Sequence, residues 1–315
     1  MSYSIALNHL VNPNALPMPE PIWTDFQQQI VQTELEQIYR SGTRLSPRFA
    51  PTAAIAPQLY AYTTLESTNL FLADLMQQGA AEGTVVIAQQ QQSGRGQRGR
   101  VWQSEVGGIY LSVALRPDCS AQAAQQLTLC CSWGIAQALR QGSIPVQIKW
   151  PNDLVIEGRK LAGILTETRL RQGQVKQAVV GVGLNWRNTT PAHGIALRDW
   201  LIEQGRSPLP SMEQVVAQVL WGLLSAYGLW QQVGMAAIAP DYHELLSHLG
   251  QWVPLGDRQV QVIGISPQGD LEVREAETES DRHLQPGEIH LGYATPGEPN
   301  SNALSAGKGG EINRG

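Results

Sequence analysis

The sequence predicts an α+β fold in which a mixed sheet with flanking helices is followed by a small all-β unit. Two observations predict it. Between residues 56 and 249, apolar runs typical of strands alternate with amphipathic helical patterns, and several runs follow one another without a helix between them, which favours antiparallel pairing. Between residues 250 and 294 the apolar runs are shorter and Gly-containing turns separate them, as in a small β-barrel.

The first 55 residues predict an irregular arm with one helix. Asn and Pro are frequent in residues 1–22, whereas the apolar residues of 23–40 recur at the spacing of one amphipathic helix. Pro47, Pro51 and Pro57 follow it. A helix-turn-helix unit needs two helices joined by a short turn, so this segment is a poor candidate for a DNA-binding domain.

The central unit, residues 56–249, carries the longest succession of strand and helix patterns. Its first helix is expected to begin at Ser67-Thr68-Asn69, because Ser or Thr is a natural N-cap. We expect strands at 59–62, 84–90, 109–115, 146–150, 161–168 and 175–184 and further helices at 121–141, 212–232 and 235–249. The tail, residues 295–315, has almost no large apolar side chains and is expected to be disordered.

The composition is that of an ordinary globular protein. Of the 315 residues, 42% are hydrophobic and 16% charged, and the net charge of -5 argues against nucleic acid as the main partner. Cys119, Cys130 and Cys131 form no CxxC pattern, so we expect reduced thiols in a cytoplasmic protein. Neither a signal-peptide pattern nor an apolar run of membrane-spanning length is present, so a soluble protein is expected.

The most informative segment is a loop with the sequence Gly94-Arg95-Gly96-Gln97-Arg98-Gly99-Arg100-Val101-Trp102. Glycines let the backbone approach a ligand closely, and arginines present forked donors to phosphate and carboxylate oxygens. Trp102 offers a flat face for a base. Together these residues suit an anionic ligand that carries a nucleobase, although a solvated basic turn or an RNA-contacting patch would fit the composition too.

The loop matches neither of two common nucleotide-binding motifs well. Gly94, Gly96 and Gly99 have GxGxxG spacing, but the next predicted element is a strand at 109–115 rather than the helix of a dinucleotide-binding unit. The Gly-Lys-Ser/Thr of a P-loop is missing from this segment.

A second cluster brackets a tight hairpin, from Lys149-Trp150-Pro151-Asn152-Asp153 to Lys160 and Gly163. Lys160 begins a buried strand, so its amine is expected at a strand end, where it can neutralise a carboxylate or an α-phosphate. Asp153 is a candidate to bind Mg²⁺ or to orient an incoming amine. The alternative is a solvated hairpin with one surface ion pair.

A third cluster, Gly181-Val182-Gly183-Leu184-Asn185, reads as a strand that lacks bulk at two positions and ends in a side-chain amide. Glycines inside a strand mark close approach of backbone or ligand, or else a bulge or a tight core.

Taken in this order, the segments resemble the biotin–protein ligase family, over roughly residues 60–293. The resemblance implies a catalytic domain like that of class II aminoacyl-tRNA synthetases over 56–249 and an SH3-like β-barrel over 250–294. It also implies that ATP and Mg²⁺ are used to activate biotin as biotinoyl-5′-AMP. Biotin would then be transferred to a lysine of the biotin carboxyl carrier protein of acetyl-CoA carboxylase.

The resemblance also implies a role for each matching position. Residues that would bind biotin are Ser67, Thr68, Asn69, Gln91, Arg95, Gly96, Gln97, Lys160 and Gly163. Residues that would bind ATP or the adenylate are Arg98, Arg100, Trp102, Asn152, Lys149 and Asn185. Catalysis would depend on Lys160, Arg95 and Asp153, with Asp153 also a ligand of Mg²⁺.

Two departures from the family pattern bear on function. Many relatives have Gly-Arg-Gly-Arg-Arg-Gly, whereas the fourth position here is Gln97. A neutral amide cannot replace a guanidinium as an anion clamp, so we hypothesise weaker retention of the adenylate unless Arg98 or Arg100 substitutes. Relatives with a helix-turn-helix region also repress transcription, and this chain resembles the single-function type.

Three alternatives stay open at this point, and one of them is a degenerate ligase, because of Gln97. A lipoate or octanoate ligase or transferase has a related fold, but such relatives lack a Gly-Arg-Gly loop of this kind. A non-catalytic nucleic-acid-binding module would use the Arg-rich loop and the small barrel, against the net charge of -5. The expected partners are biotin, ATP and the carrier protein, without DNA or a membrane, and the exposed edge strands are compatible with a homodimer.

Overall fold

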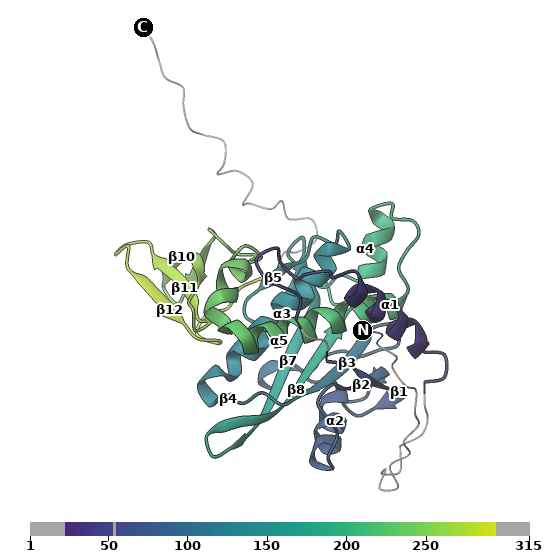
Figure 1. Ribbon diagram of the computed structural model, residues 1–315. Helices are drawn as coiled ribbons and strands as arrows, with labels where there is room; N and C mark the ends of the chain where they lie inside the picture. Colours follow the sequence, from purple (N-terminus) through teal and green to yellow (C-terminus); the bar gives the residue numbers. More distant parts are fainter. Residues whose placement is uncertain (1–22, 53–54, 294–315) are drawn as a thin grey trace.

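The computed structural model describes residues 23–52 and 55–293. Within these residues the chain folds into a mixed α+β structure (Figure 1), as the sequence predicts. The irregular arm predicted at 1–22 and the disordered tail predicted at 295–315 lie outside the described residues. No helix in the described part of the chain is both long and apolar enough to span a membrane.

A mixed sheet forms the centre of the molecule. Its strands are β1 (Gln58–Leu65), β2 (Thr84–Gln91), β3 (Ile109–Leu115), β4 (Cys119–Ser120), β5 (Gln147–Lys149), β6 (Asp153–Ile156), β7 (Arg159–Arg171) and β8 (Gln174–Leu184). They follow the order β1-β2-β3-β8-β7-β6-β5, and β4 pairs with β8. β1 and β2 are parallel, whereas the other pairs in this sheet are antiparallel.

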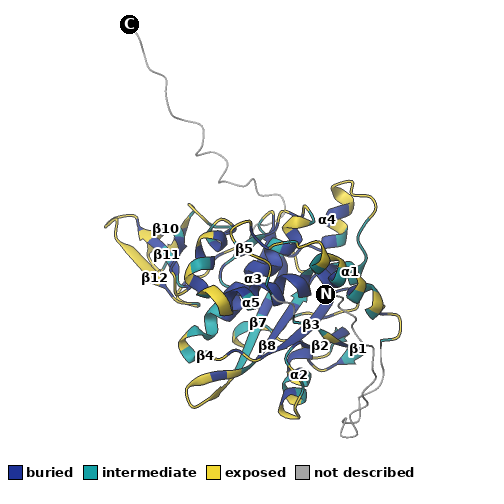
Figure 2. Cartoon of the chain, in the orientation of Figure 1, coloured by how far each residue is buried: buried dark blue, intermediate teal, exposed yellow. Residues whose placement is uncertain are grey.

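Helices cover both faces of this sheet (Figure 1). They are α1 (Gln28–Arg40), α2 (Thr68–Gln77), α3 (Ala124–Gln141), α4 (Leu197–Glu203) and α5 (Met212–His243). Because successive side chains of a strand point to opposite faces, Val86 and Ala88 pack with α2 while Val85 and Ile87 join the larger core. That core also holds the buried residues of α3 and α5, which appear dark blue in Figure 2.

The small β unit is an antiparallel sheet in the order β12-β11-β10-β9. Its strands are β9 (Trp252–Leu255), β10 (Arg258–Ile265), β11 (Leu271–Glu275) and β12 (Asp281–Leu284). Val260, Val262 and Leu271 are buried in the same core as the central unit. The indole Nε1 of Trp150 donates a hydrogen bond to the Gly269 carbonyl at 3.0 Å. The small sheet is therefore packed against the central unit.

Three local features differ from the prediction. The N-terminal helix begins at Gln28 rather than at residue 23, because Trp23 instead bonds through its backbone N–H to the Ala61 carbonyl. The helix predicted at 235–249 ends earlier, at His243. A break at Gly234 (φ 74°) separates it from the helix predicted at 212–232. Strand β6 and helix α4 were not predicted, because segments of four and seven residues carry too little periodicity.

Candidate active site

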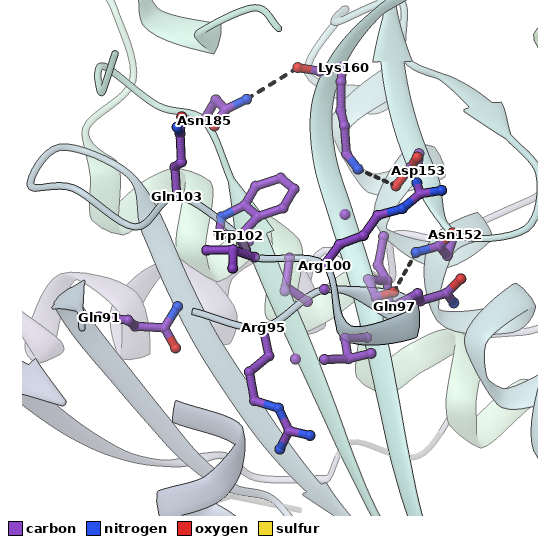
Figure 3. A pocket seen from close by; sticks show the side chains of 18 of the residues that line it. Gln91, Arg95, Gln97, Arg100, Trp102, Gln103, Asn152, Asp153, Lys160 and Asn185 are labelled. Carbon is purple, nitrogen blue, oxygen red and sulfur yellow. Dashed lines mark hydrogen bonds and ion pairs between the residues drawn. The ribbon is translucent and has the colours of Figure 1, made fainter. Parts of the chain in front are cut away.

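A cavity of about 540 Å³ lies where the loop after β2 crosses β7 and β8 (Figure 3). The loop, the start of α2, the β5–β6 turn and the ends of β7 and β8 all contribute to its walls. Of the residues to which the resemblance assigns a role, those that line it are Ser67, Thr68, Asn69, Gln91, Arg95, Gly96, Gln97, Arg100, Trp102, Asn152, Asp153, Lys160, Gly163 and Asn185. The fold thus brings together segments that are far apart in the sequence.

One end of the cavity is a hydrogen-bonded polar network at the start of α2. Gln91 Oε1 accepts from the backbone N–H of Thr68 at 2.9 Å and from its hydroxyl at 3.1 Å. Gln91 Nε2 donates to Ser104 Oγ at 2.8 Å. The fully buried Ser112 donates to Asn69 Oδ1 at 2.6 Å. Ser112 gave no signal in the sequence because a single hydroxyl inside an apolar strand looks like an ordinary core position.

The glycines of β8 allow two side chains to lie flat on the strand. A Cβ at Gly181 would lie closer than 3.0 Å to the Asn69 side chain, and one at Gly183 would lie 2.5 Å from the Trp102 indole. The pairing of β8 with β3 is regular at both positions. These glycines therefore mark close approach rather than a bulge.

The other end of the cavity is charged. Strands β5, β6 and β7 place Lys160 Nζ 2.8 Å from Asp153 Oδ1 and Lys149 Nζ 3.7 Å from Asp153 Oδ2. The Lys149 and Asp153 side chains are only 11% and 10% exposed, so the alternative of a solvated hairpin with a surface ion pair is wrong. Burial lowers the pKa of the Lys149 ammonium despite the neighbouring carboxylate.

Trp102 separates the two ends. Its ring lies over the backbone of Gly163 and Gly183, and the Lys160 ammonium is 5.1 Å from the ring centre. The Trp102 Nε1–H is buried and has no hydrogen-bond partner among the described residues. At the charged end of the cavity, Asn152 Nδ2 donates a hydrogen bond to the Ile164 carbonyl, and Asn185 Nδ2 donates one to the Lys160 carbonyl. Both amides therefore brace the strands that carry the charged groups.

The three arginines of the loop differ in their contacts and in whether they line the cavity. Arg95 Nη1 is 3.1 Å from Glu167 Oε1, and Arg95 shares the cavity with Lys160 (Figure 3). Arg100 lines the cavity as well. Arg98 does not reach it, because its guanidinium donates to the Pro286 carbonyl of the C-terminal segment. Lys149 also lies outside the lining, behind Asp153.

The described residues near Asp153 do not form a magnesium site by themselves. Mg²⁺ prefers an octahedral set of oxygen ligands. In the described part of the chain, no group of three or more His, Cys, Asp or Glu side chains is placed to hold a metal ion. Asp153 is surrounded by two ammonium groups, which compete with a cation for its oxygens.

The sequence is similar to the members of one protein family. The profile of the biotin/lipoate A/B protein ligase family matches residues 60–185. The chain is 34% identical over 213 residues to the bifunctional ligase/repressor BirA of Escherichia coli, covering 66% of each chain. This chain belongs to the biotin/lipoate A/B protein ligase family.

Other relatives in this family are similar over shorter stretches. The chain is 36% identical to BirA of Bacillus subtilis over 165 residues, 48% of this chain and 51% of that one. It therefore spans about half the length of that curated relative. It is 33% identical over 138 residues to the biotin--[acetyl-CoA-carboxylase] ligase of Paracoccus denitrificans, which covers 43% of this chain and 55% of the relative.

A solved structure shows the shared fold of the family. The biotin protein ligase of Aquifex aeolicus in complex with biotin and ATP superposes with a TM-score of 0.57 at 23% identity, covering 72% of this chain and 99% of that one. The mixed α+β architecture predicted from the sequence is thereby confirmed at the level of the fold.

Proposed function

We propose that this protein is a biotin–protein ligase that activates biotin with ATP and transfers it to a lysine of the biotin carboxyl carrier protein of acetyl-CoA carboxylase. The observation that carries the proposal is one cavity with two unlike ends. The network of Gln91, Thr68 and Asn69 suits the polar ring of biotin. Lys160 at the far end suits a carboxylate next to a phosphate.

The first step is formation of a mixed anhydride. The biotin carboxylate attacks the α-phosphorus of ATP, the bond between the α- and β-phosphates breaks, and pyrophosphate leaves. Lys160 neutralises the negative charge that gathers where the two anions meet. The loop that carries Arg95 covers the anhydride and excludes water. The buried Trp102 N–H, unpartnered among the described residues, is free to donate to the adenylate.

In the second step the carrier's lysine amine attacks the activated carbonyl and AMP leaves. A free lysine has a pKa of about 10.4, so the amine must lose a proton before it attacks. Asp153 orients that amine or accepts its proton. Because the described residues around Asp153 do not form a metal site by themselves, the phosphates of ATP would supply ligands to Mg²⁺.

The proposal includes finer points of architecture and setting. The central unit would have the class II aminoacyl-tRNA synthetase-like topology and the β9–β12 sheet the SH3-like form, with domain limits at 56–249 and 250–294. The enzyme would act in the cytoplasm, where free thiols such as Cys119, Cys130 and Cys131 stay reduced. It would act without binding DNA, and a homodimer is a prediction that the mass in solution tests.

The deciding experiment is pyrophosphate release from ATP and Mg²⁺ with biotin or with lipoate, in the absence of an acceptor. We expect release with biotin only, and a Lys160→Gln variant slower by about 100-fold or more because a preorganised charge is lost. Lys176→Gln removes a lysine that pairs with Asp118 on the surface and is the matched control, expected to match wild type. Release with lipoate alone, or equal rates for the two variants, would contradict the proposal.

A further inference from the structure

The last described segment of the chain returns from the small sheet to the cavity. Ile289 and Leu291 of this segment are buried in the main core. Pro286 accepts a hydrogen bond from Arg98 of the Gly- and Arg-rich loop. The segment is thus anchored at several points before it reaches Tyr293, which lines the cavity.

Tyr293 contacts each group at the charged end. Its hydroxyl donates to Asp153 Oδ2. Its ring is stacked on His193, with centroids 4.9 Å apart and planes inclined by 24°. The Lys149 ammonium lies 4.0 Å from the ring centre, where a cation is attracted by the face of an aromatic ring. The orientation of Tyr293 is therefore determined by its ring as well as by its hydroxyl.

The two oxygens of Asp153 have different partners as a result. Oδ1 is 2.8 Å from the Lys160 ammonium, while Oδ2 accepts from Tyr293 and is 3.7 Å from Lys149. An aspartate carboxylate that is held through one oxygen only can rotate about its Cβ–Cγ bond. With the hydroxyl of Tyr293 on Oδ2, the direction of Oδ1 is fixed, and so is the place of the Lys160 ammonium.

The phenol is suited to be a permanent donor. Burial raises the pKa of Tyr293, and the charge of Asp153 raises it further. Because the hydroxyl keeps its proton at neutral pH, it donates to the carboxylate throughout the range in which the enzyme would work.

We propose that Tyr293 is a positioning residue for adenylate formation, which holds Asp153 so that Asp153 places the Lys160 ammonium against the reacting carboxylate and α-phosphate. The proposal rests on the function proposed above. The Tyr293 ring touches Lys149 and His193 and lies 5.8 Å from the Lys160 ammonium, whereas its hydroxyl acts on the reaction through Asp153.

The test is the single-turnover rate of biotinoyl-AMP formation in the full chain. The biotin concentration that gives half of the maximal rate is measured in the same experiment. Tyr293→Phe keeps the ring and removes the tether. We expect it to slow formation about tenfold, which corresponds to the loss of one charge-assisted hydrogen bond. The half-saturating biotin concentration should change less than about twofold, which is well below the effect of losing a hydrogen bond to biotin. The reason is that Tyr293 is not among the partners of the Gln91 network.

Tyr227→Phe is the matched control, because that tyrosine also donates to a carboxylate, Glu82, but outside the cavity. It should form the adenylate at the wild-type rate. A double variant of Tyr293→Phe with Asp153→Asn should be no slower than Asp153→Asn alone, since residues that act through one another are not additive.

The outcomes separate this proposal from the function on which it rests. A wild-type protein that forms no adenylate refutes the function itself. An active wild type with an equally fast Tyr293→Phe variant refutes the tether, and a faster variant would show that Tyr293 obstructs the site. Equal losses in Tyr293→Phe and Tyr227→Phe, with matching falls in melting temperature, would assign the effect to stability and also overturn the proposal.

Discussion

Gln97 lines the cavity at the position where many biotin–protein ligases carry an arginine. Two neighbouring arginines were candidates to replace that charge. Arg98 is unavailable, because it is bound to the Pro286 carbonyl, whereas Arg100 lines the cavity. Arg100 is exposed, and water weakens the attraction between an exposed guanidinium and an anion. We therefore expect the adenylate to be held less firmly than in relatives with two arginines here.

A Gln97→Arg substitution tests this expectation. The added guanidinium should slow the release of biotinoyl-AMP about tenfold, the equivalent of one hydrogen bond to a charged group. Release is measured by trapping free adenylate after a single turnover. Arg100→Gln is the companion variant and should release faster than wild type. Equal, slow release from wild type and Gln97→Arg would reject the hypothesis.

At the scale of elements, the contact between α3 and α5 supports the charged end of the cavity from behind. The backbones of the two helices approach closely at Gly134 and Gly222, where a Cβ on either glycine would lie closer than 3.0 Å to the carbonyl oxygen of the other. Tyr242 of α5 donates to the Pro151 carbonyl, next to Asn152. The spacing of these helices therefore affects the β5–β6 turn.

A Gly134→Ala substitution should destabilise the fold. Backbone atoms must move to admit the methyl group, and overpacking of this kind costs about 1–3 kcal/mol, measured as the free energy of unfolding in urea. Gly228→Ala is the control on the partner helix α5, because its Cβ would meet Thr52 at ordinary contact distances of 3.4 Å and more. It should be neutral or stabilising, because Ala favours a helix over Gly by about 1 kcal/mol. Equal stability of the two variants would contradict this account.

At the scale of the whole molecule, His248 lies in the junction between the central unit and the small sheet. The backbone N–H of Ser247 donates to the Ile148 carbonyl and that of Gln251 to the His248 carbonyl. Burial, followed by the charge of Lys149, lowers the pKa of His248 to about 4 from 6.5. The folded state therefore binds this proton less readily than the unfolded state.

This difference predicts the sign of the pH dependence of stability. A histidine whose pKa is lowered in the folded state stabilises it above the unfolded value, and that stabilisation is lost as the pH falls. The window runs from about 6.5 down to about 4. The melting temperature should fall between pH 7 and pH 5, and less so in His248→Gln. His283→Gln, at an exposed position, should keep the wild-type slope. An unchanged slope in His248→Gln would refute the assignment.

The order of strands and helices could be predicted because it is local. Alternation in a strand and the 3.6-residue repeat of a helix are set by neighbours in the chain, so strands such as β3 and helices such as α3 were found in place. The glycines of the loop and of β8 indicated a ligand site, because the absence of a side chain leaves room for a ligand to approach the backbone closely. Short elements and helix ends, as at α4 and the start of α1, depend on distant contacts and were missed.

The sequence by itself therefore determined the fold class, the segments that form the cavity and the lysine at its charged end. Only the tertiary structure decided where the side chains point. It turned Arg98 towards Pro286 and away from the cavity. It also brought Tyr293 to Asp153 across a separation of 140 residues. The physical reason is that backbone patterns follow from local sterics and hydrophobic periodicity, whereas a hydrogen bond between remote side chains exists only after the core has packed.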